Sequence, residues 1–245
     1  MMIKSLISSL SKTLSIALDQ NEGGSSTPVT STVAVTKNTV VQWGAVDAIV
    51  GEDYDTHIRE LGPTTNYSGN SQFDVTKWAA GDAVNMIYGV SLTEIPAGAS
   101  IDSAILRLKT YKSGNPNGTE AFTIGAYRIS TNPANIDFST MTWNQSSTGN
   151  NWTVPGAWGD LSPTTSLDSV GVGPVKSTWF EWDITAGLSA AHSENPTSTT
   201  LNILLERNDI FEHQTADSYI GQARRFHGDT STDGSRPEII ITFTV

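Results

Sequence analysis

The sequence contains no cysteine and few charged residues. None of its 245 residues is Cys, and Asp, Glu, Lys and Arg together make up only 16% of the chain. Without cysteine the chain has no disulfide framework, no thiolate nucleophile and no thiolate zinc site. No stretch approaches the roughly 20 apolar residues of a membrane-spanning helix. A chain of this length can instead bury a hydrophobic core large enough to fold without metal ions or disulfides.

Positive charge is particularly scarce. Lys and Arg number 14 against 25 Asp and Glu, which gives a formal net charge of −11. A surface this acidic repels phosphate backbones at long range, so nucleic acid is not an expected partner.

From Trp43 onward, short stretches of alternating apolar and polar residues dominate the chain. Turn-forming pairs such as Gly62-Pro63, Asn132-Pro133 and Asn195-Pro196 separate them. This pattern, without alternating long helices, predicts an all-β fold for residues 43–245, an antiparallel, jelly-roll-like β-sandwich. One or two helical turns are expected at 184–192. Strands are expected at 57–61, 72–75, 86–90, 105–108, 122–127, 179–182, 201–205 and 238–243.

The first twenty residues carry the strongest helical pattern in the chain. Apolar side chains recur every three or four residues, while Ser and Lys fill the other face. About two and a half heptads are too short to be stable alone, so residues 1–22 are predicted to be a docking or oligomerisation helix. Two alternatives are a secretory signal, which Lys12 interrupts, and a membrane-surface helix, which needs more basic residues. The docking residues are Ile3, Leu6, Ile7, Leu10, Leu14, Ala17 and Leu18.

Residues 23–42 differ from both neighbouring segments. Gly, Ser, Thr and Val dominate this segment, which lacks the bulk to form a core of its own. A linker is therefore predicted. The alternative is an edge strand around Val29 to Val35, where apolar and small polar residues alternate.

Tryptophan is concentrated in one part of the body. Five of the seven lie within forty residues, in or just after the irregular stretch 141–175: Trp143, Trp152, Trp158, Trp179 and Trp182. One interpretation is that these rings hold a long loop against the sandwich. The other is an exposed aromatic platform that stacks on sugar rings, with Trp143, Trp152 and Trp158 as the candidate glycan-binding residues.

A series of short segments occurs in a recognisable order along residues 47–245: Asp55–Ile58, Pro63–Gly69, Val90–Ile101, Ser103–Leu108, Thr142–Asn144, Asn151–Asp160, Trp182–Thr185, Arg225–His227 and Arg236–Ile240. In this order they resemble the DNRLRE-type domain, a carbohydrate-binding-module-like β-sandwich. The resemblance implies the sandwich fold and suggests glycan binding. Residues 226–229 (FHGD) stand where the family has Ser-x-Glu, so no role of that glutamate carries over.

No constellation of catalytic residues is recognisable. The four histidines (His57, His192, His213 and His227) lack metal-ligand spacing, and no nucleophile elbow, phosphate loop or dinucleotide fingerprint occurs. Glu181 and Asp183 would share one face of a strand about 7 Å apart, which nominally fits an inverting glycosidase. Alternating acids are common on the solvent face of a sheet, so no catalytic residue is predicted.

No cofactor or functional metal is expected either. The acids Glu52, Asp53 and Asp55, or Asp229 and Asp233, could gather oxygens around a structural calcium ion, but neither set has EF-hand spacing. Solvated acidic turns are the preferred interpretation. Most of the seven arginines are expected to pair with nearby acids.

These features favour a non-catalytic structural protein of a virion or another extracellular surface. The helix would bind other copies of the chain and a larger protein assembly, and the sandwich would face outward and bind host or environmental polysaccharide. The predicted N-terminal helix is short and rich in Ser and Leu, and it resembles those of tailed-phage structural proteins, such as decoration proteins and fibres. The alternative is a secreted carbohydrate-binding module of a polysaccharide-degrading system. A third hypothesis, a glycan-degrading enzyme, has almost no support in the sequence.

Overall fold

A computed structural model describes residues 36–42, 55–78, 81–92, 95–111, 121–130, 135–194, 200–208, 222–228, 231 and 235–244. All of them belong to one compact unit, residues 34–245. The predicted docking helix, residues 1–22, lies outside the described residues.

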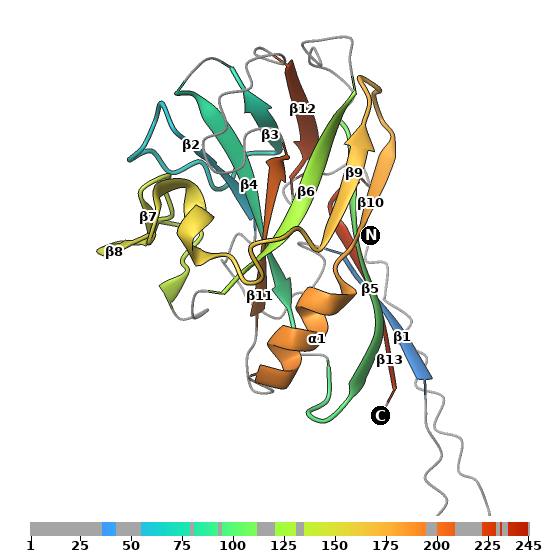
Figure 1. The fold of residues 1–245 in the computed structure, drawn as a ribbon. Helices are drawn as coiled ribbons and strands as arrows, with labels where there is room; N and C mark the ends of the chain where they lie inside the picture. Colours follow the sequence, from blue (N-terminus) through green and yellow to red (C-terminus); the bar gives the residue numbers. More distant parts are fainter. Residues whose placement is uncertain are drawn as a thin grey trace, which may run out of the picture. The chain divides into compact units, whose positions relative to one another are not determined.

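Two antiparallel sheets make up most of this unit, which is sandwich-like (Figure 1). The smaller sheet has four strands, whose spatial order is β1 (Thr36–Gln42), β13 (Glu238–Thr244), β5 (Ser100–Lys109) and β10 (Trp179–Asp183). The larger sheet has seven strands. Six follow the order β12 (Gln222–His227), β3 (Gln72–Lys77), β4 (Ala83–Ser91), β11 (Thr200–Arg207), β6 (Phe122–Ile129) and β9 (Asp168–Val172), and β2 (Asp55–Arg59) pairs with β4.

The main core lies between the two sheets, as the alternation predicts. Along β5, Ala104, Leu106 and Leu108 are buried, and the residues between them are partly exposed. The same alternation in β13 buries Ile239, Ile241 and Phe243. Because successive side chains of a strand point to opposite faces, β5 and β13 each give one face to this core and one to solvent.

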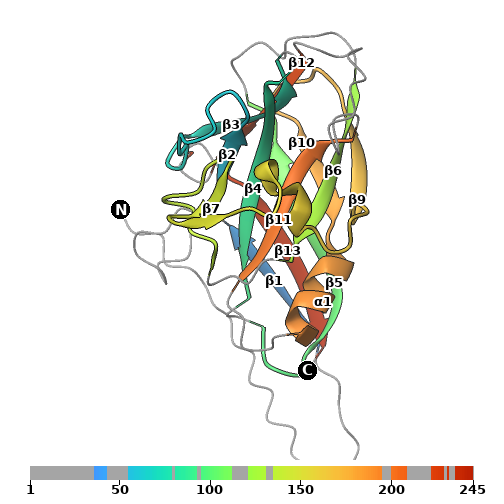
Figure 2. The ribbon, with the colours of Figure 1, turned by 60° about the vertical axis from the view of Figure 1, so that its left-hand side comes forward.

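A second, separate core lies on the outer face of the large sheet. It is covered by residues 135–163, which include the short hairpin strands β7 (Gln145–Ser147) and β8 (Asn150–Asn151) and the 3-10 segment η2 (Pro155–Asp160). Figure 2 shows η2 in front of β4 and β11. Both strands are therefore buried on both faces: in β4, Met86 and Tyr88 join the main core, whereas Ala83 and Ile87 join the second.

One helix, α1 (Thr185–Glu194), packs against β5 and β11. It is longer than the one or two turns predicted. Asp183 fixes its start, because the carboxylate oxygen Oδ1 accepts hydrogen bonds from the backbone N–H (2.9 Å) and the hydroxyl (2.5 Å) of Thr185. Leu188 and Ala191 then join the main core.

The 23–42 segment contains a strand that the linker prediction does not include. β1 forms a full antiparallel register with β13, from Thr36 opposite Thr244 to Gln42 opposite Glu238. It is the edge strand of the small sheet, so the sandwich extends N-terminally beyond the predicted boundary at residue 43. The alternative strand position, Val29 to Val35, lies outside the described residues.

Candidate functional site

The three tryptophans predicted as a glycan platform are core residues. Trp143 and Trp152 are 4% exposed and Trp158 is 8% exposed, and all three belong to the second core. Their ring faces are therefore not available for stacking on a sugar, and the platform prediction must be corrected. The alternative interpretation, that these rings hold the 135–163 segment against the sheet, agrees with their burial.

Two indole N–H groups of the second core, those of Trp158 and Trp152, have specific acceptors. Trp158 Nε1 donates to both carboxylate oxygens of Glu206 on β11, each at 2.8 Å, and Glu206 is fully buried. Trp152 Nε1 donates to the carbonyl of Thr142 at 3.0 Å. Trp143 meets Trp158 edge to face, with ring centroids 5.2 Å apart. A buried indole N–H without an acceptor costs free energy, so these contacts fix the orientation of each ring.

The backbone of η2 is shaped around the same rings. Gly156 has φ +85°, and a Cβ at this position would lie 2.9 Å from the ring of Trp143. Ala157 follows with φ 69°, which is unusual for a residue with a side chain. Asp160 accepts hydrogen bonds from the backbone N–H and the hydroxyl of Thr153, each at 2.8 Å. The segment is thus held in one conformation by its own contacts.

Glu181 and Asp183, the nominal glycosidase pair, both make structural contacts on β10. Glu181 forms an ion pair with Arg107, with 2.8 Å between Oε1 and Nε. Asp183 caps α1, and its backbone N–H donates to Asp168 Oδ2 at 2.9 Å. Both carboxylates are therefore engaged in structural contacts.

Three of the four histidines lie in the described part of the chain, and they are spread over different elements. His57 on β2 stacks on Tyr67 (centroids 4.3 Å apart) and meets Phe73 edge to face, and burial lowers its pKa to about 4. His227 on β12 is buried and shares a 3.0 Å hydrogen bond between Nδ1 and the hydroxyl of Ser231. His192 is buried in α1. Contacts hold His57 and His227 in place, and burial in α1 holds His192.

Only one of the five acids considered as calcium ligands lies in the described part of the chain. Asp55 is fully buried in β2, and the remaining four (Glu52, Asp53, Asp229 and Asp233) lie outside the described residues. Among the residues that the structure describes, no group of three or more His, Cys, Asp or Glu could hold a metal ion.

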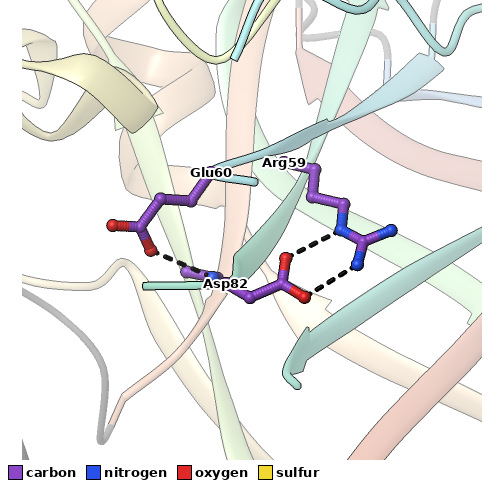
Figure 3. Close-up of polar contacts among 4 residues, drawn as sticks. Arg59, Glu60 and Asp82 are labelled. Carbon is purple, nitrogen blue, oxygen red and sulfur yellow. Dashed lines mark hydrogen bonds and ion pairs between the residues drawn. The ribbon is translucent and has the colours of Figure 1, made fainter. Parts of the chain in front are cut away.

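Several arginines pair with acids that are distant in the sequence. Figure 3 shows Arg59 of β2 in a two-pronged contact with Asp82, in which Nε and Nη2 each lie 2.7 Å from a carboxylate oxygen. Beside it, the carboxylate of Glu60 accepts the backbone N–H of Ala83 at 3.1 Å. Further arginine–acid pairs in the described part of the chain include Arg225–Asp74, Arg128–Glu194 and Arg107 with both Glu181 and Glu238.

Two further arginines are buried inside the sandwich. The guanidinium carbons of Arg207 and Arg224 lie 4.6 and 4.5 Å from the centroid of the Phe122 ring. Burial, together with the charge of Arg207, lowers the pKa of Arg224 to about 10. Each of these side chains is 1% exposed, so this cluster belongs to the core and offers no accessible surface.

The outward face of the four-stranded sheet brings a different set of side chains together. Trp179 on β10 lies opposite Lys109 on β5, and in the next row Glu181 lies opposite Arg107, which lies opposite Glu238 on β13. The Arg107 guanidinium carbon and the Lys109 ammonium lie 5.0 and 5.5 Å from the centroid of the Trp179 ring. All five side chains retain solvent exposure, from half-buried Trp179 to exposed Glu181.

The sequence prediction did not include Trp179 in the platform, although a signal for it was present. In WFEWD (179–183), strand alternation puts Phe180 and Trp182 on one face and Trp179 and Glu181 on the other. Trp182 is fully buried, and its indole N–H donates to the carbonyl of Ile124 at 2.9 Å. The outward aromatic residue is thus Trp179, placed by a strand and not by the irregular segment.

Comparisons with known proteins do not identify a family for this chain. No family model and no curated protein matches the chain. Among solved structures, the human polyomavirus 6 VP1 pentamer is similar at 10% identity, over 83% of this chain and 98% of that chain, with a TM-score of 0.24. A TM-score this low carries no information about function. Within the described residues, no helix is long and apolar enough to cross a membrane.

Proposed function

We propose that this chain is a non-catalytic structural protein of a virion or another extracellular surface. Residues 1–22 dock it onto other copies of itself and onto a larger protein assembly. The sandwich, which under this proposal has the jelly-roll-like topology of the DNRLRE-type domain, is displayed outward and binds glycans. The heptad-like apolar stripe at the start of the chain and the acidic body support this division of roles.

One observation carries the non-catalytic part of the proposal. In the described part of the chain, the side chains best suited to acid–base chemistry make structural contacts. Glu181 pairs with Arg107, Asp183 caps α1, and Glu206 accepts the Trp158 indole N–H. A carboxylate that holds a helix start or a core ring in place cannot leave that contact to move a proton without a loss of stability.

The alternative function is a secreted carbohydrate-binding module. The outward position of Trp179, with charged side chains around it, favours glycan binding under either proposal. The two differ in how the protein is held at its place of action. A structural protein needs residues 1–22 for assembly, whereas a secreted module loses an N-terminal signal and acts alone.

Size-exclusion chromatography with light scattering tests the docking role. The test variant carries Leu6→Ser, Leu10→Ser and Leu14→Ser, which remove the apolar stripe. The matched control carries Ser5→Ala, Ser8→Ala and Ser9→Ala, on the other face of the same predicted helix. We expect the full chain and the control to be oligomeric and the test variant to be monomeric. A monomeric full chain, or an unchanged oligomer in the test variant, contradicts the docking role.

A further inference from the structure

We infer that the outward face of the four-stranded sheet, around Trp179, binds the uncharged hexose units of a polysaccharide. The inference rests on the glycan-binding part of the proposed function and names the surface and the ligand class for it. We call the part of this outward face around Trp179 the Trp179 face. It consists of Trp179, Lys109, Arg107, Glu181 and Glu238.

The first argument is the position of the indole ring. Trp179 lies on β10, the strand at one end of the small sheet, and its direct cross-strand neighbour is Lys109. Directly opposite residues of an antiparallel pair have Cβ atoms about 5 Å apart, so the two side chains lie against each other. The cations of Arg107 and Lys109 lie 5.0 and 5.5 Å from the ring centroid. These contacts hold a large aromatic side chain in a fixed position on a solvent-facing sheet.

The second argument is the balance of charge. Arg107 and Lys109 contribute two positive charges, and Glu181 and Glu238 contribute two negative charges, so the four charges around Trp179 balance. Exposed Asp183, which follows Glu181 on the same face of β10, adds one negative charge, and the whole chain has a net charge of −11. Arg107 pairs with both glutamates at 2.8 Å. A polyanion would meet Glu181, whose side chain is 57% exposed, and also the overall negative charge of the protein. An uncharged ligand meets neither repulsion.

The third argument is chemical complementarity. A hexose ring has a face of C–H groups, which can lie on an indole ring, and a rim of hydroxyls, which both donate and accept hydrogen bonds. The Lys109 ammonium, which lies over the indole at 5.5 Å from the ring centroid, offers donors, and the exposed Glu181 carboxylate, which pairs with Arg107, offers acceptors. An aromatic side chain with donors and acceptors close to it suits an uncharged, hydroxyl-rich ring.

Affinity electrophoresis in gels that contain soluble polysaccharide tests the inference. The uncharged probes are dextran, hydroxyethyl cellulose and galactomannan, and the anionic probe is polygalacturonate. Trp179→Ala is compared with Trp78→Ala, because Trp78 is also half-buried but follows β3 of the other sheet. Near-ultraviolet circular dichroism verifies that each variant is folded. Lys109→Ala is a second test variant, which removes a donor without removing a ring.

We expect the unmodified chain to be retarded by at least one uncharged polymer. Trp179→Ala should weaken that binding about tenfold or more and Lys109→Ala several-fold, whereas Trp78→Ala should leave it unchanged. The inference would be overturned if no uncharged probe retarded the unmodified chain, or if only polygalacturonate did. It would also be overturned if a folded Trp179→Ala variant and the Lys109→Ala variant both bound as tightly as the unmodified chain. Retardation by polysaccharide is measured independently of the oligomeric state of the variants in residues 1–22. If no glycan binding is found, the docking role of residues 1–22 is therefore not affected.

Discussion

The indole N–H of Trp158 points between the two carboxylate oxygens of Glu206, 2.8 Å from each, and joins the 135–163 segment to the C-terminal end of strand β11. Both side chains are buried, so the hydrogen bond is shielded from water. Hydrogen bonds to a charged acceptor are stronger than those between neutral groups. This contact is therefore a main attachment of the second core to the large sheet.

Trp158→Phe should lower the free energy of unfolding by about 1–3 kcal/mol, because it removes the N–H and leaves the buried carboxylate with one donor fewer. The matched control is Trp152→Phe, which removes an N–H that donates to the neutral carbonyl of Thr142. Its loss should be smaller, about 1 kcal/mol. Urea unfolding followed by tryptophan fluorescence measures both. Equal losses in the two variants would contradict a special role for Glu206.

Gly156→Ala should also destabilise the protein. The backbone φ of +85° disfavours a side chain, and the new Cβ would lie 2.9 Å from the Trp143 ring. Gly149 is the control: it has φ +81° but nothing within 4 Å of its Cβ position. Gly149→Ala should therefore lose about 1 kcal/mol from backbone strain alone, and Gly156→Ala clearly more. Thermal unfolding compares the two, and a Gly149→Ala loss as large as the Gly156→Ala loss would exclude the contribution of the ring contact.

His57 makes stability depend on pH in a defined range. Its pKa in the folded chain is about 4, below the ordinary value of 6.5, because burial disfavours the charged imidazole. Between these values the unfolded chain binds a proton that the folded chain does not. The contribution of His57 is therefore fully present above pH 6.5 and is lost as the pH falls toward 4, by at most about 1.4 kcal/mol per pH unit.

His57→Phe tests this dependence, since a phenyl ring can keep the contacts with Tyr67 and Phe73. The free energy of unfolding, measured in urea at pH 7 and pH 5, should fall less for the variant than for the unmodified chain. The carboxylates and the other histidines are present in both proteins, so the difference isolates His57. Parallel pH dependences would mean that the imidazole is already hydrated or charged in the folded state.

The Arg59–Asp82 pair should have a larger coupling energy than the Arg128–Glu194 pair. Both pairs have two nitrogen–oxygen contacts, and they differ in exposure. The more exposed partner is 34% exposed in the first pair (Arg59) and 61% exposed in the second (Glu194), so water reaches the second pair more easily. We expect about 1–3 kcal/mol for the first pair and less than about 1 kcal/mol for the second. Double-mutant cycles with Arg→Met and acid→Ala variants, measured by urea unfolding at low and high salt, give both values. The reverse order would contradict the burial argument.

Alternation in the sequence was sufficient to predict β5, β10 and β13 of the small sheet, but neither β1 nor the second core. β5 and β13 each give one face to solvent, so their apolar residues recur with a period of two. In β4 and β11, by contrast, both faces are buried, which hides the period and with it the presence of a covering layer.

The tryptophan prediction was wrong for a related reason. Residues 144–151 (NQSSTGNN) are polar and have no regular period, so the sequence suggests an exposed loop. The rings on either side of it are nevertheless buried, and local sequence does not reveal the packing that buries them: the indole N–H of Trp158 donates to Glu206, which is 48 residues away. Trp179 needed only the alternation of its own strand.

A sheet with apolar layers on both sides has a consequence for the order of unfolding. The backbone hydrogen bonds between β4 and β11 lie between two dry layers, and water reaches them only after one layer has separated. We expect the outer layer to detach while the sandwich persists, because the two cores are separate clusters on opposite faces of the large sheet. The backbone amide protons of β4 and β11 should therefore be the last to exchange with deuterium.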